Sequence, residues 1–374
     1  MSTARMQVAG NRRSKLVSGI LVNGILALIC LVWFIPTAGL LVSSIRPRND
    51  VVSTGWWTIF PHQEYLTSQQ IQLQAGLPLD QPIQVPGVAG PITDAQLRDG
   101  YTLPDGRKVI WANRRSRLVN VQTQQWTSTA NFTLQNYQSV LFGQQYTFQE
   151  PGGGVRTEQG ENMGNAFISS LTVAIPATVI PILIAAFAAY AFAWMRFPGR
   201  KILFAMVVGL LVVPGQVALI PLLRTFSSLH ISGTYLSLWL VHTGFGLSLA
   251  IYLLYNYIAG LPRETLEAAF IDGASPFTLF IRLILPLSVP ALASFAIFQF
   301  MWVWNDFLNA LIFLGTSPDV QVVTIKLQQM VGSRGQDWHL LTAGAFVSML
   351  LPLIVFFSLQ RYFVRGLLAG SVKG

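Results

Sequence analysis

The chain has 374 residues, of which 52% are hydrophobic and only 10% are charged. Soluble domains carry roughly 25% charged residues, so this composition excludes a disordered chain and an ordinary cytosolic enzyme and indicates a membrane protein. The net charge of +9 does not indicate nucleic-acid binding, because the basic residues separate hydrophobic stretches instead of forming one soluble face. The single cysteine, Cys30, lies in the first apolar stretch, so an intrachain disulfide is excluded.

Six apolar stretches have about the 20 residues that a ~30 Å hydrocarbon core requires of a spanning helix. In chain order they are 16–44, 166–194, 202–223, 235–258, 287–314 and 340–363. The first is about twice as long as the apolar region of a signal peptide and no small-x-small cleavage site follows it, so we expect a retained anchor. Prolines in or at these spans predict kinks, which neighbouring helices make tolerable. They are Pro176, Pro181, Pro214, Pro221, Pro290 and Pro352.

The basic residues set the predicted orientation. One side of the membrane holds the N-terminus, the second and fourth connections and the tail. Their basic residues are Arg5, Arg12, Arg13, Lys15, Arg196, Arg200, Lys201, Arg263, Arg282, Arg361, Arg365 and Lys373. The acidic residues on that side are Glu264, Glu267 and Asp272, so the whole positive excess lies there. The positive-inside rule then places both termini in the cytoplasm, although Arg46 and Arg48, just outside the first span, weakly oppose this orientation.

A long polar loop, 46–165, is predicted outside the membrane between the first two spans. Residues 101–111 predict two short strands around a Pro-Asp-Gly turn, and 151–154, Pro-Gly-Gly-Gly, predict a hinge. Five aromatic residues predict a small core: Trp56, Trp57, Tyr65, Trp111 and Trp126. The loop is either a docking surface or gate for an extracytoplasmic partner, or a folded spacer that packs on a neighbouring subunit.

The fourth connection, 259–286, predicts a short helical hairpin in the cytoplasm. Pro262 suits the start of the first helix, and Gly273 suits its end. Ser275-Pro276 is typical of a cap that opens a second helix, which we expect to end before Pro286.

Apolar side chains are predicted to lie on one side of each helix of this hairpin. They are Leu266, Ala269 and Phe270 in the first helix and Phe277, Phe280 and Ile281 in the second. A helix that lies on a membrane usually carries Lys and Arg on its polar face, whereas this one carries carboxylates. The hairpin is therefore predicted to insert into a groove on another protein.

The hairpin sequence Glu267-Ala-Ala-Phe-Ile-Asp-Gly273, continued through Ile284-Leu-Pro286, resembles the EAA loop of ABC-importer permeases. Further segments are similar to the MalG-type carbohydrate permease subunit. They are Asn131-Phe-Thr-Leu-Gln-Asn-Tyr137, Tyr190-Ala-Phe-Ala-Trp-Met-Arg-Phe-Pro-Gly199, Trp304-Asn-Asp-Phe307 and Gln360-Arg-Tyr-Phe-Val-Arg-Gly-Leu-Leu-Ala-Gly-Ser-Val-Lys-Gly374. The resemblance covers 16–45 loosely and 127–374 closely.

This resemblance implies the partners and the coupling site. A MalG-like subunit pairs with a MalF-like permease, a homodimer of ABC ATPase subunits that bind ATP and Mg²⁺, and an extracytoplasmic sugar-binding protein. The coupling residues carried over to this chain are Glu267, Ala268, Ala269, Asp272 and Gly273. The tail that reaches toward the ATPase would include Arg365, Gly366, Gly370 and Lys373.

The segment of about 80 residues between Asn49 and Gln125 is longer than typical MalG-like subunits carry. Extended loops of this kind, with text similar to Gly100-Tyr-Thr-Leu-Pro-Asp-Gly106, resemble the alpha-glucoside permease subgroup. The resemblance therefore implies a di- or oligosaccharide substrate.

The remaining polar residues leave open how a sugar would pass. The sequence contains no Gly-x-x-x-x-Gly-Lys-Ser/Thr loop and no His-Glu-x-x-His pair, so we expect no bound cofactor, no metal and no catalytic residue in this chain. Asn305, Asp306 and Trp304 are candidates for the substrate pathway, although a helix-capping or packing role is the alternative for the first two, and an interfacial one for the tryptophan. His242 is an intramembrane histidine, either a ligand or a hydrogen-bonded core residue.

The sequence thus predicts an all-α polytopic protein of the bacterial or archaeal inner membrane, with six transmembrane helices in the type I importer permease fold and a β-containing extracytoplasmic insertion between helices 1 and 2. Its expected parts are 1–45, 46–165, the core 166–363 and the tail 364–374. The alternative is an ion-coupled secondary transporter that acts without an ATPase, for which only Asp306 and His242 offer coupling groups. An intramembrane enzyme lacks any catalytic pair.

Overall fold

The computed structural model describes residues 2–143, 145–149, 154–159, 162–333 and 337–369. The chain divides into two compact units. Residues 46–133 form the inserted unit, and residues 1–45 with 134–374 form the helical unit.

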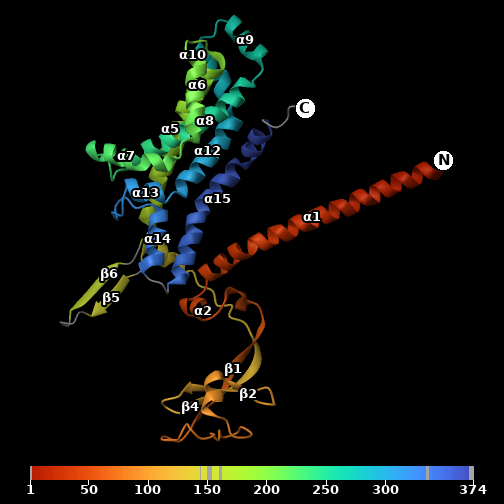
Figure 1. Cartoon of the computed structure of the whole chain (residues 1–374), viewed down its shortest axis with the longest axis vertical. Helices are drawn as coiled ribbons and strands as arrows, with labels where there is room; N and C mark the ends of the chain where they lie inside the picture. Colours follow the sequence, from red (N-terminus) through yellow and green to blue (C-terminus); the bar gives the residue numbers. More distant parts are fainter. Residues whose placement is uncertain (1, 144, 150–153, 160–161, 334–336, 370–374) are drawn as a thin grey trace. The chain divides into compact units, whose positions relative to one another are not determined.

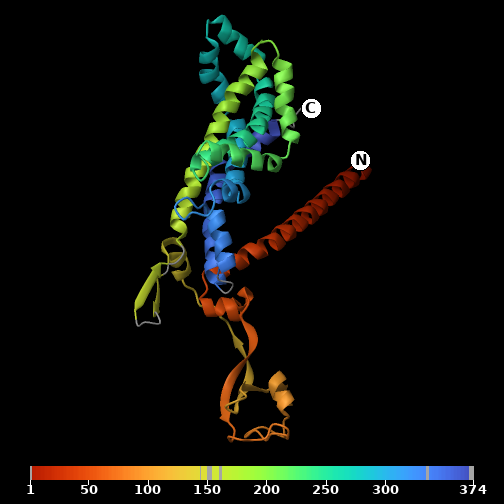
Figure 2. The ribbon, with the colours of Figure 1, turned by 60° about the vertical axis from the view of Figure 1, so that its left-hand side comes forward.

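Four continuous helices of the described helical unit are long and apolar enough to cross a membrane. They are α1 (Ser2–Ser44), α5 (Met163–Trp194), α8 (Tyr235–Ala259) and α15 (Trp338–Ala369). Their apolar windows match four of the predicted spans to within a few residues. α5 packs along α8, and α12 (Val289–Trp304) packs between α5 and α15, so these helices run side by side in Figures 1 and 2.

The predicted spans 202–223 and 287–314 are broken rather than single helices. In the first, α6 (Arg200–Gly209) and the 3₁₀ turn η2 (Leu210–Val212) meet α7 (Gly215–Ser228) at 99°. In the second, a helical segment over Pro276–Leu287 meets α12 at 70°, at the first residues of the predicted span. Further on, the same span passes from α12 to the separate helix α13 (Leu308–Phe313) between Trp304 and Leu308.

Proline accounts for both breaks. Val213, the residue before Pro214, is extended, as the proline ring demands of its predecessor. Pro290 follows the second break directly and has no N–H to donate into a continuous helix. The other prolines lie inside unbroken helices: Pro176 and Pro181 in α5, Pro221 in α7 and Pro352 in α15.

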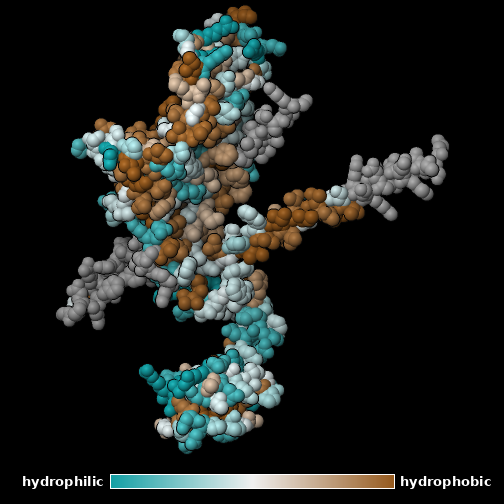
Figure 3. Space-filling view, in the orientation of Figure 1, coloured by the Kyte–Doolittle hydropathy of each residue, from teal (hydrophilic) through white to brown (hydrophobic). Residues whose placement is uncertain are grey.

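Two apolar cores hold the helical unit together. One joins the ends of α5, α8 and α12 to the short helices α4 (Gln135–Phe142), α13 (Leu308–Phe313) and α14 (Val323–Ser333). The other joins the opposite ends of α5 and α8 to the hairpin at 263–287. The outward faces of α1, α5 and α15 stay apolar and exposed, as the brown surface in Figure 3 shows, which is the pattern of helices that face lipid or another membrane protein.

The inserted unit is built on an antiparallel sheet of order β1-β4-β3-β2. Its strands are β1 (His62–Gln72), β2 (Tyr101–Thr102), β3 (Lys108–Asn113) and β4 (Leu118–Thr127), and its helices are α2 (Arg48–Ser53), the 3₁₀ turn η1 (Trp56–Ile59) and α3 (Asp94–Asp99). β2 and β3 pair around the Pro-Asp-Gly turn where the sequence predicts two strands, and Gly106 takes the left-handed conformation with φ of 84°.

The buried core of the inserted unit is aliphatic, and of the five aromatic residues predicted for it Trp111 packs against it, half-buried. Val109, Val119 and Val121 from the sheet are buried against the segment that contains Ile83, Val85 and Leu97. Trp57 and Trp126, expected in the core, are 63% and 70% exposed.

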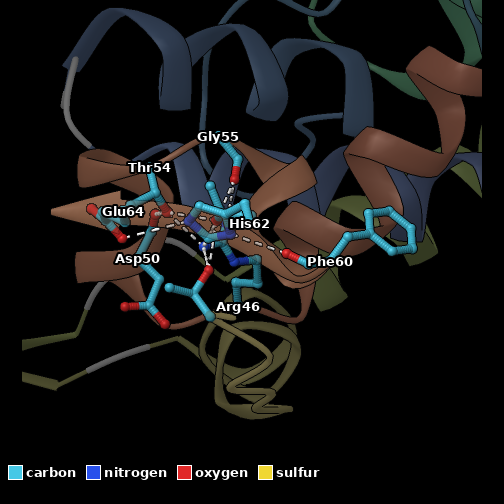
Figure 4. A network of polar contacts seen from close by, with 9 residues as sticks. Arg46, Asp50, Thr54, Gly55, Phe60, His62 and Glu64 are labelled. Atoms are coloured by element: carbon cyan, nitrogen blue, oxygen red, sulfur yellow. Dashed lines mark hydrogen bonds and ion pairs between the residues drawn. The ribbon is translucent and has the colours of Figure 1, made fainter. Parts of the chain in front are cut away.

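Arg46, the first residue of the inserted unit, is fully buried and organises its base (Figure 4). Its guanidinium donates to the carbonyl of Gly55 at 3.0 Å and to the hydroxyls of Thr54, Thr58 and Thr129 at 2.7, 3.2 and 2.9 Å. Burial lowers the pKa of Arg46 from its ordinary value, and the nearby Asp50 opposes that shift. Arg46, whose charge weakly opposes the predicted orientation, therefore stabilises the base of this unit.

Asp94 is a second charged centre in the inserted unit. Its carboxylate accepts from Arg114 Nε and Nη2 at 2.9 and 3.0 Å and from Trp111 Nε1 at 3.1 Å, and it pairs with Arg98 at 2.7 Å. The hydrogen bonds from Arg114 hold the pKa of Asp94 below its usual range, and partial desolvation opposes them.

A two-stranded ribbon precedes α5. It pairs β5 (Gln145–Gln149) with β6 (Val155–Gln159). The predicted hinge at 151–154 falls between these strands, and its first three residues lie outside the described residues.

Candidate functional site

The hairpin between α8 and α12 begins with α9 (Arg263–Ile271). Gly273 follows it with φ of 80°, and the backbone N–H groups of Gly273 and Ala274 return to the carbonyls of Phe270 and Ala269 at 3.1 and 3.0 Å. This pair of hydrogen bonds is a Schellman motif, which requires a residue that tolerates positive φ after the end of the helix. The predicted end of the helix at glycine is confirmed.

The second arm of the hairpin starts at α10 (Pro276–Leu279), and Ser275 caps it by accepting the N–H of Thr278 at 3.1 Å, as predicted. The prediction that this arm ends before Pro286 is wrong. It continues through a π turn, η3 (Phe280–Ile284), into α11 (Leu285–Leu287). The π turn directly precedes Pro286, whose ring would collide with the carbonyl of residue 282 in a regular α-helix.

The predicted coupling residues lie on the outer side of the hairpin. Glu267, Ala268, Asp272 and Gly273 are exposed, and Ala269 is half-buried. The hairpin also exposes apolar groups, with Ile271 at 85% and Phe277 at 66%. Phe277 is therefore exposed, whereas Phe280, predicted on the same side of this helix, is buried. An exposed tip that combines carboxylates with large apolar side chains suits a groove on a protein partner.

Aromatic contacts fasten the hairpin to the ends of α5 and α8. The ring of Phe280 is buried and stacks on Phe187 at 4.2 Å between centroids, and the hydroxyl of Tyr190 donates to the carbonyl of Pro276 at 3.2 Å. The hydroxyl of Tyr257 donates to the carbonyl of Leu287 at 3.1 Å. These contacts connect the hairpin to α5 and α8.

The predicted tail residues are only partly described. Arg365 and Gly366 lie in the backbone of α15, whereas Gly370 and Lys373 lie outside the described residues.

A cavity of about 610 Å³ opens where α6 and α7 break, against α8, α12 and α13. Its volume falls in the range of sites for small organic ligands. The bend at Pro214 and Gly215 forms one wall, lined further by apolar side chains of η2 and α7. The side chains that line it with polar or aromatic groups are Gln216, Phe245, Ser248, Gln299, Trp302, Asp306 and Asn309.

Gln299 is locked in the wall of this cavity. Its side-chain amide donates to the carbonyls of Ala177 on α5 and His242 on α8 at 3.1 and 3.2 Å, so it ties three helices together. The amide lies against Gly246, where an added Cβ would approach Gln299 Oε1 to 2.6 Å. The helices approach one another this closely because position 246 has no side chain.

Asp306 caps α13 from the cavity wall. Its Oδ2 accepts the N–H of Ala310 at 3.2 Å, and its Oδ1 accepts the side-chain amide of Asn309 at 3.1 Å. Nε2 of the fully buried His242 lies 3.4 Å from Oδ2, and the edge of the His242 ring meets the ring of Trp302 at 5.4 Å. Because α12 ends at Trp304, Asp306 lies at a helix junction and not inside a continuous span as predicted.

The three predicted pathway residues have different places. Asp306 lines the cavity. Asn305 is exposed and donates to the carbonyl of Met301 at 2.7 Å, outside the cavity lining. Trp304 is buried, donates to the carbonyl of Ser348 at 2.9 Å and packs on Phe300.

The sequence reasoning overlooked Gln299 and did not select Trp302. The signal was present, because a glutamine in a long apolar run is costly in a membrane unless it has a task. Trp302 follows three residues later and so lies on the same helical face. Trp302 lines the cavity at 42% exposure, whereas Trp304 turns away.

Comparison with known families gives this geometry a context. The model of the family described as "Binding-protein-dependent transport system inner membrane component" matches residues 167–368, from the start of α5 to the end of α15, which is more than half of the chain. The chain belongs to this family. The match includes the cavity, the hairpin and the whole bundle of α5, α8, α12 and α15.

Several relatives of this permease match nearly its whole length. The osmoprotective compounds uptake permease protein GgtD of Synechocystis is 46% identical over 97% of this chain and 95% of its own length. The alpha-glucoside transport system permease protein AglG of Rhizobium meliloti is 47% identical over 93% and 95%. A probable ABC transporter permease of Pyrococcus horikoshii is 32% identical over 91% and 93%. Matches of this extent include most of the inserted unit, which lies outside the family model.

Proposed function

We propose that this permease forms half of the translocation pathway of an ATP-driven, binding-protein-dependent importer for alpha-glucosides or related small oligosaccharides. The observation that carries the substrate class is the identity of 46–47%, over more than nine tenths of the chain, to permeases named for alpha-glucosides and for osmoprotective compounds. The cavity supports it, since it offers a partly exposed tryptophan beside amide side chains and a carboxylate.

These groups suit a neutral polyhydroxylated ligand. The ring of Trp302 offers an apolar face to the C–H side of a sugar, and the amide oxygens of Gln299 and Asn309 can accept from its hydroxyls. The carboxylate of Asp306 accepts the capping hydrogen bond of α13 and lies beside His242. These contacts favour a structural role for Asp306 in the cavity wall and disfavour a role as an ion-coupling group.

The proposed complex has four kinds of subunit. A second, MalF-like permease covers the cavity, a homodimeric ABC ATPase binds ATP and Mg²⁺, and an extracytoplasmic binding protein delivers the sugar. The hairpin tip around Glu267 seats in the ATPase, and the tail with Arg365, Gly366, Gly370 and Lys373 lies near it. Six spans, with each bent pair counted as one, and cytoplasmic termini complete this arrangement; the four continuous helices and the basic connections support it.

The coupling part is tested with Glu267→Lys. We expect uptake of a labelled alpha-glucoside into vesicles holding the reconstituted complex to fall at least about tenfold, a loss of about 1.4 kcal/mol, because a cation replaces an exposed carboxylate at the docking tip. The ATPase should also co-purify less with the variant, while insertion into the membrane stays unchanged. The matched control is Glu64→Lys on β1, an exposed carboxylate of the inserted unit. Uptake by Glu267→Lys at the wild-type rate would show that the tip is not the coupling site.

The cavity part is tested with Trp302→Ala. Stacking of a sugar on one aromatic ring contributes about 1 kcal/mol, so we expect its loss to lower uptake roughly fivefold while the ATPase stays bound. The control is Trp338→Ala, which removes an exposed tryptophan at the start of α15. Equal uptake by both variants would exclude Trp302 from the pathway.

A further inference from the structure

Three cations gather in the short connection between α5 and α6. Arg196, Arg200 and Lys201 line an open cavity of about 540 Å³ together with Phe197, Gly199 and Ile202. No acidic side chain is among the residues that line it. The Met-Arg-Phe-Pro-Gly sequence that supplies this site has no task in coupling or in the sugar cavity.

Aromatic packing fixes the base of this cavity. The ring of Phe197 lies 6.0 Å from Phe192, which lies 5.5 Å from Phe204, and Phe204 lies 4.2 Å from Tyr255 on α8, all measured between ring centroids. The cations are therefore presented from a packed support and not from a loose loop.

The guanidinium of Arg200 donates to the carbonyl of Met195 at 2.8 Å, which closes the turn that Gly199 makes with φ of 77°. This bond uses one Nη atom of Arg200. The remaining N–H groups of a guanidinium still form the planar fork that matches phosphate oxygens.

An apolar face of α6 continues directly from the cations. Ile202, Met206 and Leu210 recur at every fourth residue and are 68%, 54% and 58% exposed. From Ile202 to Leu210 the helix rises about 12 Å, close to the depth of one leaflet of a ~30 Å hydrocarbon core. Positive charge at one end and an apolar face of one leaflet's depth match the two parts of an anionic phospholipid.

We propose that Arg196, Arg200 and Lys201 bind the phosphate headgroup of an anionic phospholipid whose acyl chain lies along Ile202 and Met206 of α6 and Leu210 of η2. The site goes beyond the proposed transport function and does not depend on the sugar. An anionic patch of the ATPase is the rival occupant. It explains the charges but leaves the apolar face of α6 uncovered, and the ATPase already has the exposed hairpin tip as its docking site. Basic pockets beside transmembrane helices attract acidic lipids by the same electrostatics.

The test is native mass spectrometry of the assembled transporter, titrated with phosphatidylglycerol and, separately, with phosphatidylcholine of the same acyl chains. We expect wild type to bind phosphatidylglycerol at least about tenfold more tightly, and the variant Arg196→Gln/Arg200→Gln/Lys201→Gln to lose that preference. The matched control, Arg12→Gln/Arg13→Gln/Lys15→Gln, removes the same charge from the predicted cytoplasmic N-terminus, outside the hairpin that is proposed to dock on the ATPase, and should keep it. Lys201→Gln alone should weaken phosphatidylglycerol binding about fivefold, so the site stays testable if the triple variant does not fold.

Equal affinity of wild type for the two lipids, or an unchanged preference in the triple variant, would overturn the proposal. Loss of the ATPase from the triple variant with the lipid preference intact would assign the cations to the ATPase instead. Displacement of the lipid by millimolar inorganic phosphate would assign the site to a soluble anion. Lipid affinity and ATPase retention are measured here without sugar uptake, so failure of this proposal is separable from failure of the transport proposal.

Discussion

The helical unit and the inserted unit satisfy their buried polar groups in opposite ways. In the helical unit, neutral side chains donate to backbone carbonyls of neighbouring helices, as Gln299 does and as Trp194 does to Ile258 at 3.1 Å and Trp239 to Thr172 at 2.9 Å. In the inserted unit, ions organise the fold, with Arg46 at the base and Asp94 beside the sheet.

The bilayer explains this difference. A backbone carbonyl inside lipid gains a partner from a neutral donor without burying a charge, whereas an ion would pay a large desolvation penalty. A unit with a polar surface keeps its ions close to water, where several hydrogen bonds compensate the smaller desolvation of each. Removing an ionic hub should therefore cost more than disturbing a neutral link.

The largest effect is expected from Arg46→Met in the inserted unit. The change keeps the length of the side chain but removes its donors to Gly55, Thr54, Thr58 and Thr129. Losing these hydrogen bonds from a charged donor, with the buried acceptors left without it, should lower the free energy of unfolding by about 3 kcal/mol. Hydrogen exchange of the full chain should show this loss of protection in η1 and around Thr129, with little change in α5 or α8.

The exposed Arg115 supplies the control for this prediction, since Arg115→Met removes a similar charge from the inserted unit without touching the base. Protection of η1 that is equal in both variants would mean that Arg46 is not the hub of the unit.

A smaller effect is expected from Gly246→Ala in the helical unit. The new Cβ would displace the amide of Gln299 and break its bonds to Ala177 and His242, so the combined overpacking and lost hydrogen bonds should cost about 2 kcal/mol. Thermal unfolding of the detergent-solubilised chain measures this loss.

Gly244→Ala is the matched control on the same helix, because its Cβ would meet nothing within 4 Å. Adding Gln299→Ala to Gly246→Ala should restore part of the stability, since the clash is then removed. If Gly246→Ala is as stable as Gly244→Ala, the close contact between position 246 and the Gln299 amide does not contribute to stability.

The hairpin was largely predictable from the sequence because local chemistry determines it. Gly273 and Ser275 act through their own backbone conformation and hydrogen bonds, which neighbouring residues in the chain satisfy. The first and last residues of four spans were predictable for a similar reason, since the composition changes there from apolar to polar.

Features that depend on distant contacts were not predictable. Pro214 predicts a kink, but not a bend of 99°, and an average over an apolar window passes across it because both arms of the bend are apolar. Whether Trp302 or Trp304 meets the cavity depends on which helices pack on each side of α12. Nor does the sequence near Arg46 reveal that Thr129, far along the chain, completes its shell.

The base of the inserted unit also closes on itself. Thr129 donates its backbone N–H to the carbonyl of Thr58 at 2.8 Å, and the pairing of β1 with β4 begins at His62 and Thr127. The two ends of the inserted unit are therefore hydrogen-bonded to each other. Lengthening a flexible connection from about 10 to about 80 residues would cost roughly 2 kcal/mol of loop-closure entropy. Because the two ends of the inserted unit are paired with each other, the unit costs its host no more loop-closure entropy than a short turn would. A module with adjacent ends can be gained, lost or exchanged during evolution without refolding its host.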